Sequence, residues 1–274
     1  MKTNRILTLA ALLVLLATCG CSKRNNMNTH IKFETTQGDI TVVLYNETPQ
    51  HRDNFIKLVK EGVYDSTLFH RVIKQFMIQA GDPESKTASD TAMLGGGDVG
   101  YTIPAEFNDK FFHKRGVLAA ARQGDQVNPE KASSGCQFYI VTGRKFREAQ
   151  LLDMEASRNE QRVESIFNDL ARQHMKEIYK MRKENDNEGL LELQDTLEAK
   201  ARELFKQAEP FKLTPQQIAA YTIIGRAPPL DGEYTIFGEV TEGMETVEKI
   251  EAAKTGRADR PVMDIRILKA SIVE

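Results

Sequence analysis

The sequence is short of several residue types, and each shortage excludes a class of protein or site. It has no tryptophan and only three cysteines, two of which, Cys19 and Cys21, lie near the N-terminus. Cys136 is the only cysteine in the rest of the chain, so a disulfide is excluded there unless one of the first two is retained. The net charge is −2 and no basic block exceeds a few residues, so nothing suggests nucleic-acid binding.

The sequence also gives no sign of a metal site, a phosphate-binding loop or a nucleophilic cysteine. The histidines and carboxylates show no spacing typical of a metal site, and no cofactor is predicted. The glycine-rich segment 94–98 has neither the lysine nor the hydroxyl of a phosphate-binding loop, so we interpret it as a flexible loop that passes close to other backbone. Cys136 lies in an apolar stretch and is predicted to be a small buried residue, not a nucleophile. His113 is expected to be a partly exposed structural residue.

The first residues have the pattern of a targeting segment. Two basic residues, Lys2 and Arg5, precede the apolar run 6–17, and small residues and two cysteines follow it. The run is too short for a comfortable transmembrane span and indicates a secretory signal. One interpretation is a plain signal peptide that is cleaved nearby. The two cysteines at the cleavage site favour a bacterial lipoprotein signal peptide over residues 1–21.

Under this interpretation the lipid is carried by Cys21 or Cys19. Gly20 is the better small residue before Cys21, whereas Leu16 is the better apolar residue three positions before Cys19. The polar residues 22–28 then form a tether. The interpretation predicts a protein of the bacterial cell envelope that is held at a membrane by its N-terminal lipid and faces the periplasm.

The chain after the tether is rich in patterns typical of strands. Residues 29–45 alternate around a Gln-Gly-Asp turn and predict a β-hairpin. Thr48 and Pro49 open a helix that ends at Gly62. An amphipathic helix is predicted at 243–250. Further strands are predicted at 116–121, 137–142, 237–240 and 261–272.

Between residues 146 and 224 the composition changes to Glu, Lys, Arg, Gln and Leu, with no proline before Pro210. Apolar residues keep helical spacing on both sides of a break at 185–189, which predicts a long helical hairpin. Thr214 and Pro215 begin a shorter helix. The charge runs are interpreted as solvated faces of these helices.

The stretch 69–82 is the one around which the chain is organised. Read as one extended segment, it places a mixed set of residues on one face: Arg71, Ile73, Gln75, Met77 and Gln79. Such a mixture of charged, amide and apolar side chains is unfavourable in a buried core and is typical of the lining of a groove. His70 should point to the opposite face, so it is not predicted to be a catalytic base.

Four motifs occur together in the order that one known family shows. They are FHRVIKQFMIQAGD at 69–82, GVLAAAR at 116–122, SGCQFYI at 134–140 and LDGEYTIFGEV at 230–240. In these residues the chain resembles the cyclophilin-type peptidyl-prolyl cis-trans isomerases. The resemblance implies a mainly β fold, a closed eight-stranded antiparallel β-barrel capped by two helices. The barrel domain would comprise residues 29–145 and 225–274, and residues 146–224 would be a helical insertion.

The resemblance also implies an active site. Arg71 matches the family's catalytic arginine, and Gln79 matches the glutamine that orients it. The positions that match the substrate-binding groove are Phe76, Met77, Ala121, Arg122, Gln137, Tyr139, Leu230 and Tyr234. Two of them depart from the usual pattern, because Arg122 stands where asparagine is common and Tyr234 where histidine is common. Since the chain has no tryptophan, strong cyclosporin binding is not expected.

Together these features predict an enzyme that accelerates rotation of X–Pro bonds in extracytoplasmic polypeptides and so assists their folding. Its partners would be proline-containing polypeptides. One alternative is a peptide-binding chaperone, in which the barrel has little activity and the helical insertion holds client chains. Another is that the insertion only braces the barrel.

Overall fold

The computed structural model describes residues 28–223, 225, 227 and 230–273. The predicted signal peptide, nearly all of the tether, and the two candidate lipidation sites Cys19 and Cys21 therefore lie outside the described residues. Among the helices of the described part, none combines the length and the hydrophobicity of a membrane span.

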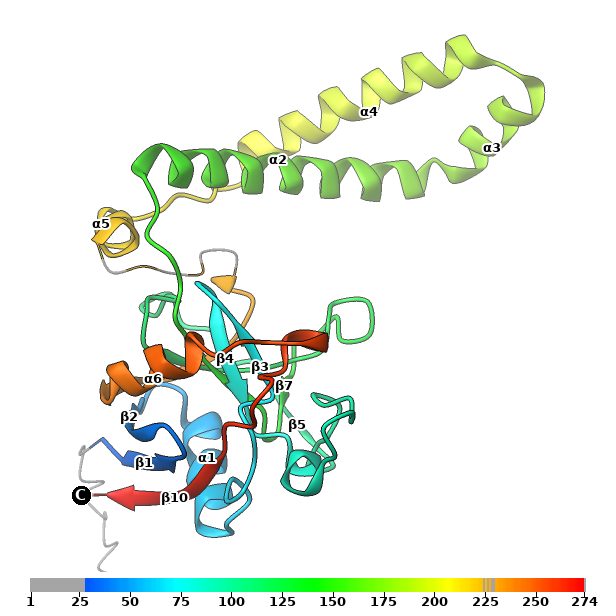
Figure 1. The fold of residues 1–274 in the computed structure, drawn as a ribbon. Helices are drawn as coiled ribbons and strands as arrows, with labels where there is room; N and C mark the ends of the chain where they lie inside the picture. Colours follow the sequence, from blue (N-terminus) through cyan, green and yellow to red (C-terminus); the bar gives the residue numbers. More distant parts are fainter. Residues whose placement is uncertain (1–27, 224, 226, 228–229, 274) are drawn as a thin grey trace, which may run out of the picture.

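The fold is built on one antiparallel sheet that curves into a half-barrel (Figure 1). Its eight strands lie in the order β10 (Ile267–Val273), β1 (His30–Thr35), β2 (Gly38–Leu44), β9 (Ile236–Glu242), β6 (Val117–Ala120), β8 (Phe138–Val141), β4 (Met77–Ala80) and β3 (Arg71–Ile73). A separate two-stranded sheet pairs β5 (Thr102–Ile103) with β7 (Ser133–Ser134). In β1 every second residue is buried, as expected for a strand with one face on the core.

The predicted closed barrel is wrong, because the two ends of the sheet do not pair as strands within the described residues. The edges are β3 and β10, and β3 has only three residues. The segment before β3 does approach the start of β10 and the residues just before it, through bonds from Phe69 N to Ile265 O (2.9 Å) and from Ile267 N to Thr67 O (2.8 Å). Beyond this contact β3 turns into a tight hairpin with β4, so the ladder does not continue along β10.

Aromatic and branched side chains fill the inner face of the half-barrel. The rings of Phe33 and Phe138 stack with 5.5 Å between centroids, and Phe55 meets both edge-on. Phe55 belongs to α1 (Pro49–Lys60), and α6 (Met244–Glu251) adds Val247 and Ile250 to the same core. Both helices were predicted from the sequence, and both use their apolar stripe to cover the sheet.

The central stretch 69–82 is a hairpin and not the single extended strand that its alternation predicted. Strands β3 and β4 pair antiparallel, with Arg71 opposite Gln79. The connection closes on a bond from Phe76 N to the last carbonyl of β3 (3.1 Å), and Gln75 has a φ of 60°. No glycine, proline or asparagine marks this turn in the sequence. The hairpin thus brings Arg71 and Gln79 together across two strands.

The helical hairpin that was predicted between residues 146 and 224 is present, and it projects from the half-barrel as a long arm (Figure 1). The arm consists of α2 (Glu148–Gln173), α3 (Met175–Glu184) and α4 (Asn187–Gln207). Helices α2 and α4 pack through a buried cluster of Val163, Leu170, Leu197 and Ala201. The predicted break is a turn in which Asn185 adopts a φ of 58° and Asp186 accepts a bond from Gly189 N (2.9 Å) at the start of α4.

The base of the arm is packed onto the half-barrel. Leu151 of α2, Leu213 and Tyr221 form a buried cluster, and Phe112 of the half-barrel packs against it. Tyr221 belongs to α5 (Pro215–Ile223), the short helix expected after Thr214. These contacts place α5 beside the chain segment that leads into β6, close to the groove described next.

Candidate active site

A chain of side-chain hydrogen bonds runs inward from Arg71. Arg71, the first residue of β3, donates from Nη1 to Gln79 Oε1 (3.5 Å). Gln79 donates from Nε2 to Gln137 Oε1 (3.0 Å). Gln137 in turn donates to the backbone carbonyls of Gly95 and Gly97 (3.0 and 2.8 Å). Because each amide nitrogen has an acceptor, the chain fixes both amides so that Gln79 presents an oxygen to the guanidinium.

The glycine-rich loop at the end of this chain is anchored by the buried carboxylate of Asp82. Its oxygens accept bonds from Gly95 N (2.6 Å), Gly97 N (3.4 Å) and Glu84 N (2.8 Å). A Cβ on Gly97 would lie 2.1 Å from Asp82 Oδ1, so a larger residue does not fit. The loop was predicted to pass close to other backbone, but its close neighbours are the side chains of Asp82 and Gln137.

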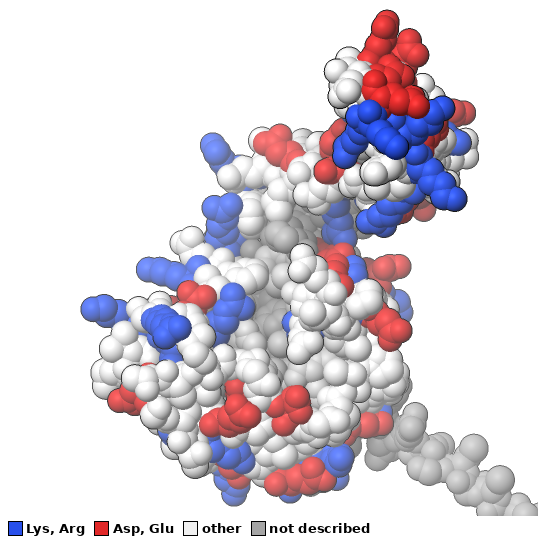
Figure 2. All heavy atoms as spheres, turned by 90° about the vertical axis from the view of Figure 1, so that its right-hand side faces the viewer, with Lys and Arg blue, Asp and Glu red and all other residues white. Residues whose placement is uncertain are grey.

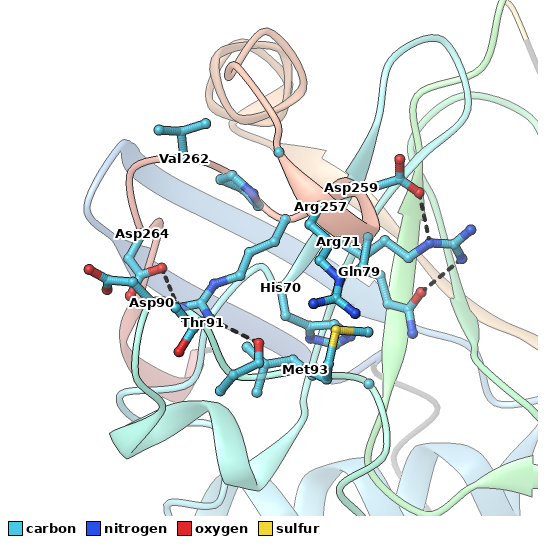
Figure 3. A pocket seen from close by; sticks show the side chains of 17 residues that line it. His70, Arg71, Gln79, Asp90, Thr91, Met93, Arg257, Asp259, Val262 and Asp264 are labelled. Atoms are coloured by element: carbon cyan, nitrogen blue, oxygen red, sulfur yellow. Dashed lines mark hydrogen bonds and ion pairs between the residues drawn. The ribbon is translucent and has the colours of Figure 1, made fainter.

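Arg71 also lines an open cleft between residues 90–95 and residues 256–264 (Figure 3). Its side chain is 44% exposed, and Nε donates to Asp259 Oδ2 (3.4 Å). Ala258 and Asp259 have φ values of 55° and 59°, which residues other than glycine rarely adopt. The guanidinium is therefore held between Gln79 and Asp259 and still faces solvent, where it can donate to a bound group. No sequence pattern indicated Asp259.

His70 lines the same cleft, contrary to the expectation that it points to the opposite face (Figure 3). It is only 3% exposed, and neither ring nitrogen has a hydrogen-bond partner among the described residues. Burial lowers the pKa of His70 to about 4, and the nearby Asp82 carboxylate offsets this only in part. The ring is therefore neutral at neutral pH.

Residues that match the apolar part of the substrate groove meet in a second cluster, apart from the main core. Met77 and Tyr139 are buried in it. The half-buried residues packed against it include Phe76, Ala121, Leu230 and Tyr234. Strand β4 joins this cluster to the hydrogen-bonded chain, because Gln79 lies opposite Arg71 on one side and opposite Tyr139 on the other. The result is an apolar surface, suited to a small ring, beside an exposed cation.

The Arg122 side chain is hydrogen-bonded to the segment that carries Tyr234 and packs on it. It is only 5% exposed, and Nε donates to the Glu233 carbonyl (2.7 Å). Its guanidinium carbon lies 4.6 Å from the centre of the Tyr234 ring, and Nη1 donates to Asp125 Oδ1 (2.6 Å). Within the described residues, the backbone N–H and C=O of Arg122 make no hydrogen bond. They are available to a bound peptide.

His113 is fully buried, so the prediction of a partly exposed residue is wrong. Its Nε2 lies 2.9 Å from the Tyr139 hydroxyl, and its Nδ1 lies 2.9 Å from Asp231 Oδ1. Burial raises the pKa of Tyr139 well above its ordinary value, so this hydroxyl stays protonated. A polar ring is tolerated behind the apolar cluster because the fold supplies both partners. One of these partners, Asp231, lies 118 positions further along the chain, beyond the reach of any local sequence pattern.

The described residues contain no group of three side chains that could hold a metal ion. Cys136 is buried, as predicted, and burial raises the pKa of its thiol to about 11. The thiol is therefore protonated at neutral pH and is a poor nucleophile. The chemistry that the arrangement offers is donation from Arg71 to a group held on the apolar surface.

Comparison with known proteins gives one family. A sequence model of the cyclophilin-type peptidyl-prolyl cis-trans isomerase/CLD family matches residues 30–198 and 212–272. A peptidyl-prolyl cis-trans isomerase-like 1 protein of Gibberella zeae is 27% identical over 250 residues, covering 90% of this chain and 97% of the relative. A protein of Streptococcus pyogenes named as a bifunctional phosphatase/peptidyl-prolyl cis-trans isomerase is 27% identical over 246 residues. That match covers 89% of this chain and 38% of the longer protein.

Among solved structures, the chain is similar to a cyclophilin-type peptidyl-prolyl cis-trans isomerase of Cryptosporidium parvum. The TM-score is 0.52 at 19% sequence identity, and the match covers 90% of this chain and 99% of the other. At this level of identity the likeness shows the fold.

Proposed function

Because this chain belongs to the family of cyclophilin-type peptidyl-prolyl cis-trans isomerases, we propose that it accelerates rotation about X–Pro bonds in polypeptides outside the cytoplasm and so assists their folding. The observation that carries the proposal is the exposed Arg71 guanidinium, oriented by Gln79 beside the apolar cluster of Met77 and Tyr139. The substrates are proline-containing polypeptides. A structure of the Cryptosporidium parvum relative was determined in the presence of the dipeptide Ala-Pro.

Arg71 can lower the barrier to this rotation without breaking a bond. Uncatalysed rotation is slow because the amide must lose its resonance, at a cost of about 20 kcal/mol. When the amide twists, its nitrogen becomes pyramidal and regains a lone pair. A guanidinium N–H can donate to that lone pair, which is available only in the twisted amide, so the interaction favours the transition state over both planar forms. The mechanism requires neither a nucleophile nor a cofactor.

The neighbouring residues would hold the proline in place. The pyrrolidine ring fits against the half-buried side chains of Phe76 and Leu230, with Met77 and Tyr139 beneath them. The backbone of Arg122 can bind the flanking peptide, since its N–H and C=O are not used within the described residues. The activity is tested by cis-to-trans relaxation of a proline tetrapeptide. A folded chain that leaves this rate unchanged would contradict the proposal.

The proposed location rests on the targeting pattern at the N-terminus, with its lipid on Cys21 or Cys19. Expressed in a bacterium with labelled palmitate, the full chain should take up the label and remain with the membrane fraction. One of the variants Cys19→Ser and Cys21→Ser should lose the label while the other keeps it, which identifies the modified residue. If the wild-type chain is never labelled, or both variants are, the lipoprotein interpretation is wrong.

A second role, holding client chains, is favoured by the far end of the arm. Met175 and Tyr179 of α3 and Leu191 of α4 are exposed there, and Figure 2 shows acidic and basic side chains gathered on the same end. Exposed apolar side chains beside charged ones can bind unfolded segments transiently.

The triple variant Met175→Ser/Tyr179→Ser/Leu191→Ser should lose most of the suppression of client aggregation and keep its isomerase rate. The matched control is Leu268→Ser/Ile272→Ser, which removes exposed apolar side chains from β10, away from the arm. Equal suppression by the wild-type chain and the arm variant would rule out the holding role. Substitution is preferable to deleting the arm, because α2 also contacts the groove, as described below.

A further inference from the structure

The base of the helical insertion touches the segment that carries two groove residues, Leu230 and Tyr234. Tyr221 of α5 donates from its hydroxyl to Asp231 Oδ2 (3.0 Å). Arg158 of α2 donates from Nη2 to the Asp231 carbonyl (3.0 Å) and lies 3.8 Å from the Glu233 carboxylate. The insertion therefore holds this segment from two helices, at the backbone and at a side chain.

Asp231 passes the contact on toward the apolar groove. Its Oδ1 accepts a bond from His113 N (2.8 Å) and lies 2.9 Å from His113 Nδ1. Since a carboxylate can only accept, Nδ1 carries a proton, which in a neutral imidazole leaves Nε2 as an acceptor. Nε2 lies 2.9 Å from the Tyr139 hydroxyl. A continuous series of hydrogen bonds thus links Tyr221, in the insertion, to Tyr139, in the groove.

All four groups of this series are buried, which makes its geometry definite. Tyr221 and His113 are fully buried, and Asp231 and Tyr139 are nearly so. The His113 ring stacks on that of Tyr139 with 6.0 Å between centroids, and Tyr139 meets Tyr234 edge-on at 5.8 Å. In an apolar surrounding the Tyr139 hydroxyl requires a hydrogen-bond partner, and His113 Nε2 supplies it. The ring is therefore held in one orientation.

We propose that the helical insertion is a working part of the isomerase site, with Tyr221 as a positioning residue that acts through Asp231 and His113 on Tyr139. Arg158 assists by fixing the segment that carries Leu230 and Tyr234. The proposal rests on the proposed isomerase function and extends it, because the groove is complete only with α5 and α2 in place. It also assigns the insertion a role besides holding clients or bracing the half-barrel.

The test is Tyr221→Phe in the full chain, which removes one hydroxyl and leaves the ring packed against Phe112. Losing one buried hydrogen bond should lower kcat/KM for a proline tetrapeptide about fivefold. The loss should appear as a higher KM with kcat nearly unchanged, since the series shapes the groove and does not touch the twisting amide. The matched control is Tyr64→Phe, because the Tyr64 hydroxyl is buried with no partner among the described residues. The control should keep the wild-type KM.

A double-variant comparison separates positioning from a general loss of stability. Tyr139→Phe removes the hydroxyl through which the series acts, so Tyr221→Phe should have no further effect on KM in that background. Independent, additive effects of the two substitutions would overturn the proposal, and so would a wild-type KM for Tyr221→Phe. An inactive wild-type chain would instead refute the proposed isomerase function, which is a different result.

Discussion

Arg71→Ala should lower kcat/KM for a proline tetrapeptide by about 10²- to 10³-fold, which is the effect of removing one donor aimed at a transition state. The guanidinium is the group that can donate to the nitrogen of the twisted amide, and water cannot replace it in a fixed position. Both of its partners, Gln79 and Asp259, bind it at a partly exposed site. The free energy of unfolding should therefore change by less than about 1 kcal/mol. Relaxation kinetics and urea unfolding on the same preparation measure the two effects.

Two further variants determine whether geometry or charge matters. Arg71→Lys keeps the positive charge but lacks the planar fork, so most of the activity should still be lost. Arg257→Ala is the matched control, because Arg257 lines the same cleft from the opposite segment (Figure 3). It should keep most of the activity. Equal losses in Arg71→Ala and Arg257→Ala would show that the cleft's overall charge, and not a donor at Arg71, supports the reaction.

Acidification should destabilise the fold through His70. Its folded-state pKa of about 4 lies below the ordinary value of 6.5, because burial disfavours the charged ring. The unfolded chain therefore binds a proton that the folded chain rejects. The stability that the neutral ring contributes is fully present above about pH 6.5 and is lost as the pH falls toward 4. The loss is about 3 kcal/mol, at 1.36 kcal/mol for each pH unit.

Urea unfolding at a series of pH values between 7.5 and 4 measures this loss. His70→Asn should flatten the fall in stability over that interval, whatever its effect at pH 7.5. His174→Asn is the matched control, since His174 is half-exposed on the arm, and it should keep the fall in stability that His70→Asn removes. Burial also lowers the pKa of His51, so the wild-type curve contains more than one histidine and only the difference between curves isolates His70. Parallel curves for the wild type and His70→Asn would contradict the assignment.

Local patterns were enough to predict most elements of the half-barrel and the arm. The alternation in residues 30–44, the helix that begins at Pro49 and the turn at 185–189 are each encoded within a few neighbouring residues. The hairpin within 69–82 was missed because its turn contains Lys74 and Gln75, neither of which is a typical turn residue. There the pairing of β4 with β8 overrides local preference.

Contacts between distant segments were beyond the reach of local patterns. The open edge between β3 and β10 depends on how far a three-residue strand can extend a ladder. The burial of His113 depends on Asp231 and Tyr139, and the position of Arg71 depends on Asp259, 188 residues later. Family motifs identified Arg71, Gln79 and Gln137 as candidates, but Asp259, which also holds the Arg71 guanidinium, comes from a loop with no motif of its own.

The most direct measurement is the cis-to-trans relaxation of a proline tetrapeptide in the presence of the purified full chain. The relaxation rate should rise in proportion to the concentration of the chain, above that of the uncatalysed reaction, which takes roughly tens to hundreds of seconds. The rise should disappear with Arg71→Ala while circular dichroism shows the fold intact. A folded wild-type chain that leaves the rate at its uncatalysed value, or a rise that survives Arg71→Ala undiminished, would contradict the account.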